Sequence, residues 1–228
     1  MSLTSLPPQF IVFEGGDGAG KSTQLKLLSE KLTELGIDHI TTREPGGTPM
    51  AEEIRDVMLK KRDEPVAGNT ELLLIFAARQ QHLDNRILPA LAEGRWVLCD
   101  RFIETTYAYQ CVGRGVNEGF FFDMMVNVVG DHSPHLTVYL DVDDEVSVQR
   151  RAARKDGSDR IDDETQEFFT KINDTLRGFA LNLPHHATVD GNQTEEAVAN
   201  DVFAFVEDLA NKTDSDLDSM ADTQTASP

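Results

Sequence analysis

The sequence is poor in cysteine and has no long apolar run. Cys99 and Cys111 are its two cysteines among 228 residues, too few for the disulfide framework of a small extracellular domain, so a reducing compartment is expected. No apolar run approaches the ~20 residues that a membrane-spanning helix needs. Residues 1–9 lack the basic and apolar regions of a secretory signal. We therefore expect a cytoplasmic protein with no membrane partner.

Basic residues are also scarce. The chain has 21 lysines and arginines against 40 aspartates and glutamates, which gives a formal net charge of −19. A surface this acidic repels the phosphates of nucleic acids and of anionic lipids, so no nucleic-acid partner is expected. Solubility alone explains such a charge. Small anionic substrates stay compatible with it, because a local cluster of arginines can reverse the field inside one cleft.

Short apolar runs alternate with amphipathic stretches along the chain. The run at 10–13, followed by glycines, predicts a buried strand, and apolar residues at 25, 28, 32 and 35 predict a helix that ends at Gly36. Further strands are expected at 37–42, 96–99, 136–140 and 187–189, and further helices at 48–61, 70–91, 118–129, 144–153, 165–183 and 194–209. This alternation predicts an α/β fold with a parallel five-stranded sheet and helices on both faces.

The composition changes at residue 212. Asp, Ser, Thr and Ala dominate from there to the end, with little apolar surface to bury. We therefore expect one globular domain over residues 1–211 and a disordered acidic tail over 212–228.

A glycine-rich loop lies between the first strand and the first helix. It fits the pattern G-x-x-x-x-G-K-[ST] with Gly15, Gly16, Asp17, Gly18, Ala19, Gly20, Lys21 and Ser22. Glycines let backbone amides approach phosphate oxygens, and the dipole of the following helix favours the same anion. In such a loop Lys21 reaches the β- and γ-phosphates of a nucleotide and the Ser22 hydroxyl binds Mg²⁺. A glycine-rich linker is the alternative, but the position between strand and helix favours a P-loop NTPase fold.

An acidic residue ends the third predicted strand. Asp100 follows the apolar run 96–99, which in this architecture faces the loop, where a carboxylate can bind magnesium or one of its waters. A turn or helix-capping aspartate is the alternative. Arg101 follows directly, and the pair Asp-Arg suits a metal beside a phosphate.

Arginines recur in the predicted loops and helix ends. Singly, each favours a surface salt bridge, but together they suggest an enclosed polyanion site, since the planar guanidinium matches phosphate oxygens. They are Arg43, Arg55, Arg79, Arg101, Arg114, Arg150, Arg151, Arg154 and Arg160. The segment from about 150 to 160 holds four of them and predicts a mobile lid that closes over the phosphates and excludes water. An exposed basic helix end is the alternative.

Six segments of the chain carry one combined pattern: FEGGDGAGKST at 13–23, TREPGGT at 42–48, FAAR at 76–79, DRF at 100–102, YAYQ at 107–110 and GRG at 113–115. Together they resemble the thymidylate kinases of the bacterial type, a family of P-loop nucleoside monophosphate kinases. The likeness covers residues 9–209. It implies transfer of the γ-phosphoryl group of ATP to dTMP to give dTDP for dTTP synthesis, with Mg²⁺ accompanying ATP, in a homodimer. The first, second and fourth segments combined separate this family from adenylate and guanylate kinases.

The resemblance also implies roles for single residues. On the acceptor side, Asp17 receives the 3′-hydroxyl of dTMP and Arg101, with Lys21, contacts the acceptor phosphate. Arg79 lies against the acceptor nucleotide, and Tyr109 crowds a 2′-hydroxyl. Further acceptor-site candidates are Arg55, Phe76, Thr106 and Gln110, the last two near the thymine ring.

On the donor side, the loop with Thr23 and the lid residue Arg150 is expected to bind ATP, and Ser22, Glu44 and Asp100 to lie close to magnesium. One branch of the family carries an arginine where this chain has Gly18, so here the lid would supply the charge that helps the transferred phosphoryl group. The lid candidates are Arg150, Arg151, Arg154 and Arg160, of which Arg154 and Arg160 are grouped with Lys21, Asp100 and Arg101 as catalytic.

Two alternatives and three departures accompany this reading. A kinase for another nucleotide is one alternative, and a nucleotide-gated switch is the other, although the segment Asp100-Arg-Phe is better suited to an acceptor phosphate. Many relatives place the thymine-stacking aromatic four residues before the helix arginine, where this chain has Ile75 and Phe76 follows, about 100° further around the helix. Cys111 and Val112 stand where relatives often have glycines. The acidic tail has no assigned counterpart.

Overall fold

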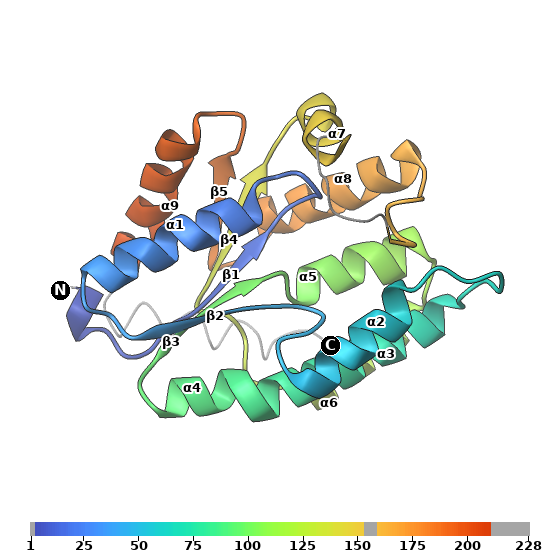
Figure 1. The fold of residues 1–228 in the computed structure, drawn as a ribbon, viewed down its shortest axis with the longest axis horizontal. Helices are drawn as coiled ribbons and strands as arrows, with labels where there is room; N and C mark the ends of the chain where they lie inside the picture. Colours follow the sequence, from blue (N-terminus) through green and yellow to red (C-terminus); the bar gives the residue numbers. More distant parts are fainter. Residues whose placement is uncertain (1–2, 153–158, 211–228) are drawn as a thin grey trace.

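Five parallel strands form one sheet in the order β2-β3-β1-β4-β5 in the computed structural model, which describes residues 3–152 and 159–210 (Figure 1). They are β1 (Phe10–Glu14), β2 (His39–Arg43), β3 (Trp96–Asp100), β4 (Leu136–Asp141) and β5 (His186–Asp190). The predicted α/β fold with a parallel five-stranded sheet is confirmed. Strand β1 is central, with β3 on one side and β4 on the other, so the order of the strands changes direction at β1. Open α/β sheets bind ligands at the carboxyl ends of the strands where this change occurs.

Helices cover both faces of the sheet (Figure 1). On one face α1 (Lys21–Glu34) and α9 (Glu195–Leu209) enclose a core that includes Ile11 and Phe13. On the other face Phe10 and Val12 pack toward α4 (Leu88–Ala92) and α6 (Glu118–Val128). The remaining helices are α2 (Pro49–Leu59), α3 (Gly68–His82), α5 (Ile103–Thr106), α7 (Asp144–Ala152) and α8 (Gln166–Asn182), with a short 3-10 turn, η1 (Leu3–Ser5). All five residues of β1 are buried, as expected of a strand covered on both sides.

The long helix expected at 70–91 is interrupted. The chain forms α3, then a π-helical segment, η2 (Leu83–Ile87), and then α4. Pro89 has no backbone N–H and its ring clashes with the carbonyl of Asn85, four residues earlier. A wider π turn before the proline relieves that clash, so the backbone stays helical from residue 68 to residue 92.

A helical stretch that was not predicted follows β3. It consists of α5 and a π-helical segment, η3 (Tyr107–Gly113). Its sequence begins Ile-Glu-Thr-Thr-Tyr, and β-branched and aromatic residues have low helix propensity. The residues expected near the thymine ring, Thr106 and Gln110, lie on this stretch. The expected tail, 212–228, and the centre of the expected lid, 153–158, fall outside the described residues.

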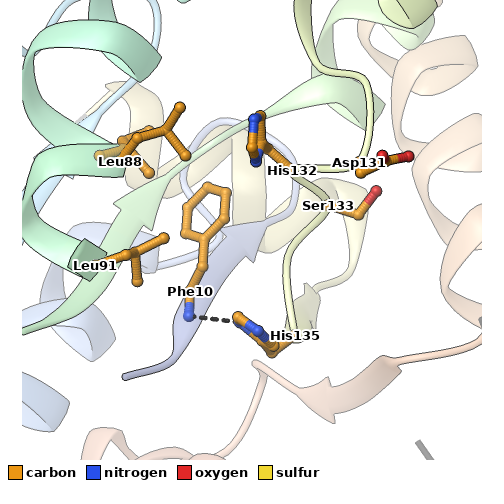
Figure 2. Close-up of a pocket in the computed structure, with 8 residues that line it drawn as sticks. Phe10, Leu88, Leu91, Asp131, His132, Ser133 and His135 are labelled. Atoms are coloured by element: carbon orange, nitrogen blue, oxygen red, sulfur yellow. Dashed lines mark hydrogen bonds between the residues drawn. The ribbon is translucent and has the colours of Figure 1, made fainter. Parts of the chain in front are cut away.

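A small cavity of about 170 Å³ lies at the amino end of β1, away from the glycine-rich loop (Figure 2). Leu88, Leu91 and His132 line it, and His135 beside it accepts a hydrogen bond on Nδ1 from the backbone N–H of Phe10 at 2.8 Å. An acceptor Nδ1 requires a neutral ring. Burial, and then the charge of His185, lower the pKa of His135 below its usual 6.5.

The substitution His135→Gln should flatten the acid side of the stability profile. A lowered pKa means that the unfolded chain binds the proton more tightly, so the free energy of unfolding falls as pH drops from about 6.5 toward the folded-state pKa. Glutamine keeps an acceptor for Phe10 but does not titrate. Urea unfolding followed by Trp96 fluorescence between pH 5 and 8 measures the difference, whose slope cannot exceed about 1.4 kcal/mol per pH unit. Parallel curves for both proteins would contradict it.

Candidate active site at the carboxyl end of the sheet

The glycine-rich loop connects β1 to α1 and encloses the side chain of Lys21. The Lys21 ammonium donates to the carbonyl oxygens of Gly15 and Gly16, both at 2.9 Å. Burial, together with the charge of Arg101, lowers the pKa of Lys21 to about 8. The lysine is therefore held inside the loop, where a phosphate that displaces the two carbonyls would strengthen its charged form.

The loop is closed against α7 at Gly18. This residue has φ +88°, and a Cβ atom built on it would lie 2.7 Å from the carbonyl oxygen of Ser147. No side chain fits there, so the charge that an arginine at this position would bring must come from another segment. Arg150 of α7 supplies one candidate, because its guanidinium donates to the carbonyl oxygens of Gly18 at 3.4 Å and Gly191 at 3.2 Å.

Ser22 and Asp100 meet across the loop. The Ser22 hydroxyl donates to Oδ2 of Asp100 at 2.9 Å, and Oδ1 of Asp100 is buried with no hydrogen-bond partner within the described ranges. A hydroxyl and an under-satisfied carboxylate fit magnesium, which takes few protein ligands and keeps several waters and phosphate oxygens. Residues 3–152 and 159–210 contain no group of three metal-binding side chains, so the ion would need oxygens from a nucleotide. A cleft of about 600 Å³, lined also by β2 and the start of α2, adjoins the pair.

Arg101, Asp17 and Tyr109 form a second cluster. One guanidinium nitrogen of Arg101 donates to Oδ1 of Asp17 at 2.7 Å and the other to the Thr105 hydroxyl at 3.0 Å. The Tyr109 hydroxyl donates to Oδ2 of Asp17 at 3.1 Å. Burial alone would lower the pKa of Arg101, but the charges of Asp17 and of its other acidic neighbours together outweigh burial and raise the pKa. Burial and the same carboxylate raise the pKa of Tyr109, which stays a neutral phenol.

Arg79 and Glu44 form a buried ion pair beside this cluster. Arg79 donates to Oε2 of Glu44 at 2.6 Å and to the Thr106 hydroxyl at 2.8 Å, while the other Glu44 oxygen contacts His82 at 3.0 Å. Burial raises the pKa of Glu44, but the charge of Arg79 and the bond to His82 outweigh it and lower the pKa. Both oxygens are thus engaged away from Ser22 and Asp100. Nη1 of Arg79 is buried and has no hydrogen-bond partner in the part of the chain described.

Glu71 of α3 is at the centre of a third cluster. Its carboxylate accepts from Gln110 at 3.0 Å and from Arg160 at 2.6 Å, and it also contacts Arg114. Arg160 donates further to the carbonyl oxygen of Met58 at the end of α2. Arg160 was expected in the lid, but its side-chain hydrogen bonds go to Glu71 and Met58 rather than to the glycine-rich loop.

The other expected site residues are placed as follows. Phe76 packs edge-on against Phe121, and the Arg79 guanidinium lies 5.1 Å from its ring centre. Arg55 donates to the carbonyl oxygen of Pro45 at 2.9 Å. Ile75 is buried, Thr23 is exposed in the first turn of α1, and Arg154 lies outside the described residues.

Sequence reasoning assigned no role to four residues that complete these clusters: Glu14, Glu71, His82 and Thr105. The sequence alone could have indicated Glu14, because an acidic residue at the end of a buried strand is unusual. Nothing in the local pattern around Glu71 or His82 marks them, because their partners lie 38 or more residues away in the chain.

Comparisons with known proteins agree with one another. Residues 13–202 match the family model described as thymidylate kinase. Thymidylate kinase of Teredinibacter turnerae is 44% identical over 200 residues, covering 87% of this chain and 97% of that protein. The corresponding enzyme of Ectopseudomonas mendocina is 46% identical over 201 residues, covering 88% and 95%. The crystal structure of thymidylate kinase from Ehrlichia chaffeensis superposes with a TM-score of 0.71 at 31% identity, over 87% of this chain and 98% of that one.

One conclusion follows from the glycine-rich loop at the carboxyl end of β1, the arginine clusters beside it and a family match over most of the chain. The chain belongs to the thymidylate kinase family, whose members phosphorylate dTMP to dTDP with ATP as the donor.

Proposed function

We propose that the chain transfers the γ-phosphoryl group of ATP to dTMP in a single cleft at the carboxyl end of β1. One observation carries the proposal: Lys21 of the loop and Arg101, from the segment after β3, both contact the carbonyl oxygen of Gly15 directly after β1. The Arg101 guanidinium is 3.4 Å from that oxygen. Two phosphorylated molecules can therefore meet there, and the charges that neutralise both are already assembled.

The proposed reaction uses these side chains to bind, orient and exclude water. Lys21 exchanges its bonds to Gly15 and Gly16 for the β- and γ-phosphates, and Arg101 binds the acceptor phosphate. Asp17, which already accepts from Tyr109, accepts from the 3′-hydroxyl of the sugar. Arg150, which already contacts the loop, is the lid arginine that we place beside ATP.

Magnesium fits the pair Ser22 and Asp100, and when bound it supplies positive charge to the phosphate oxygens. We assign Glu44 to a different task from the one expected. With both oxygens engaged by Arg79 and His82, it orients Arg79 toward the base, together with Thr106. The lid arginines Arg154 and Arg160 remain candidates for the transferred phosphoryl group, and Arg160 would first have to leave Glu71.

A homodimer and a cytoplasmic location are proposed with this function. Leu73 on α3 and Phe122 and Val126 on α6 are exposed apolar residues on two helices that pack together, and a second copy could cover them. No helix in the described ranges is long and apolar enough to span a membrane. Cys99 and Cys111 are both buried free thiols, as suits a reducing compartment.

A panel of acceptors tests the proposal. Steady-state ADP formation from ATP and Mg²⁺ should be fastest, as kcat/KM, with dTMP. A missing methyl group is worth about 10- to 200-fold at most, so dUMP should react more slowly but measurably. Thymidine has no phosphate for Arg101 and should not react. Efficient turnover of thymidine or UMP would show that dTMP is not the specific acceptor. Nucleotide hydrolysis without any acceptor would favour a switch module. Lys21→Met serves as the inactive control.

A further inference from the structure

The last residue of β1 contacts the acceptor side of the site, although it immediately precedes the donor loop. Glu14 is 1% exposed. Its Oε1 accepts from the backbone N–H of Phe102 at 2.9 Å and of Thr105 at 3.2 Å, and its Oε2 accepts from the Thr105 hydroxyl. Both oxygens are therefore directed at the segment that follows β3.

These bonds cap the unpredicted helical stretch. The first N–H groups of a helix have no partner within the helix and need an acceptor. The capping position of α5 is Phe102, whose side chain has no oxygen. Glu14 supplies the missing acceptor from 88 residues away, to the capping residue itself and to the third residue of the helix. The start of the segment that carries Thr106, Tyr109 and Gln110 is thus fixed by a side chain of β1.

Thr105 continues the connection to Arg101. Its hydroxyl has one proton, which is directed at Glu14, so a lone pair is left for the guanidinium of Arg101 at 3.0 Å. The backbone of Arg101 is held in the left-handed region, with φ 73°, and its N–H donates to the carbonyl oxygen of Phe13. Glu14, Thr105 and the end of β1 therefore fix the direction in which the Arg101 side chain leaves the chain.

We propose that Glu14 is a positioning residue for phosphoryl transfer, which holds Arg101 in its phosphate-binding orientation through Thr105 and the start of α5. The inference rests on the proposed function and extends it to a residue that acts without touching the nucleotide. It also links donor and acceptor, because the residue after Glu14 is the first glycine of the loop. Burial and the neighbouring Glu104 raise the pKa of Glu14, so a carboxyl group is costly at this position and is not explained by core packing.

Two shape-preserving substitutions test this role. Glu14→Gln removes one acceptor oxygen, and Thr105→Val removes the hydroxyl between Glu14 and Arg101. Each should lower kcat/KM for dTMP by about ten- to a hundredfold, the size expected from a misplaced binding group. The dissociation constant of a non-hydrolysable ATP analogue, measured without dTMP, should stay within about twofold of the wild type, and Thr105→Ser should restore the rate. Glu53→Gln, an exposed glutamate of α2, is the matched control.

A double-mutant cycle separates positioning from general damage to the fold. In an Arg101→Ala background, Glu14→Gln and Thr105→Val should each cost less than about twofold, because the group that they position is gone. An undiminished loss in that background, or wild-type kinetics for Thr105→Val, would overturn the proposal. If Glu14→Gln does not fold, Thr105→Val decides alone. Failure of the proposed function is seen separately, as a wild-type chain that does not phosphorylate dTMP.

Discussion

Arg101→Ala should lower kcat/KM for dTMP by about 10²- to 10³-fold, the usual effect of removing one preorganised group that stabilises transition-state charge. The guanidinium is held by Asp17, by Thr105 and by the carbonyl oxygen of Gly15, so it is in position before any nucleotide binds. Most of the loss should appear in kcat if Arg101 acts mainly on the transition state, and in KM if it binds the ground state equally well. Coupled assays at saturating ATP distinguish the two.

Two further variants make the test specific. Arg101→Lys keeps the charge but loses the planar fork, so it should recover only part of the rate. Arg95→Ala removes a guanidinium whose partner, Glu93, is an exposed neighbour outside the site, and it should leave dTMP turnover unchanged. Turnover by Arg101→Ala within about threefold of the wild type would remove Arg101 from the acceptor site.

Glu44→Ala should cost about 3–5 kcal/mol of unfolding free energy, the loss measured when one partner of a buried ion pair is removed. The side chains of Glu44 and Arg79 are 2% and 1% exposed, so water cannot replace the lost carboxylate. His82, which is fully buried, loses the partner of its Nδ1 as well and keeps only the contact of its Nε2 with Thr42. The lowered pKa of Glu44 gives the same interaction a pH signature. Its stabilisation is present above the usual carboxyl pKa of 4.5 and is lost as pH falls through the folded-state value.

Urea unfolding at pH 7, followed by Trp96 fluorescence, measures this loss. Glu52→Ala is the matched control, because Glu52 also pairs with an arginine, Arg43 at 2.8 Å, but with 38% of its side chain exposed. An exposed pair contributes at most about 1 kcal/mol. Similar losses for the two variants would show that the Glu44 pair is not effectively buried in solution.

The sheet and the loop were predictable because their signals are local. A buried parallel strand appears as an apolar run, and the glycine-rich loop is constrained by the phosphate that it binds rather than by distant packing. Even the departure in the helix expected at 70–91 has a local cause, Pro89. By contrast, α5 has poor helix propensity and no side-chain cap of its own, and the N–H groups at its start donate to Glu14 instead. No window of sequence around 103–113 contains that information.

The clusters of the site were predictable in part for the same reason. Motifs assigned roles to Asp17, Arg79, Arg101 and Tyr109. The residues that contact them could be identified only from the folded structure. Glu44 shows the limit: the family resemblance implied a place close to magnesium, but the side chain binds Arg79 and His82. Glu71 and Arg160 show it again, since their partners lie on segments far apart in the chain.

The close contact between Gly18 and the carbonyl oxygen of Ser147 also limits how this chain can evolve. A single substitution cannot place an arginine at position 18 here, because any larger residue there collides with a backbone oxygen that a mutation of Ser147 cannot remove. Helix α7 would have to shift before the loop could accept an arginine.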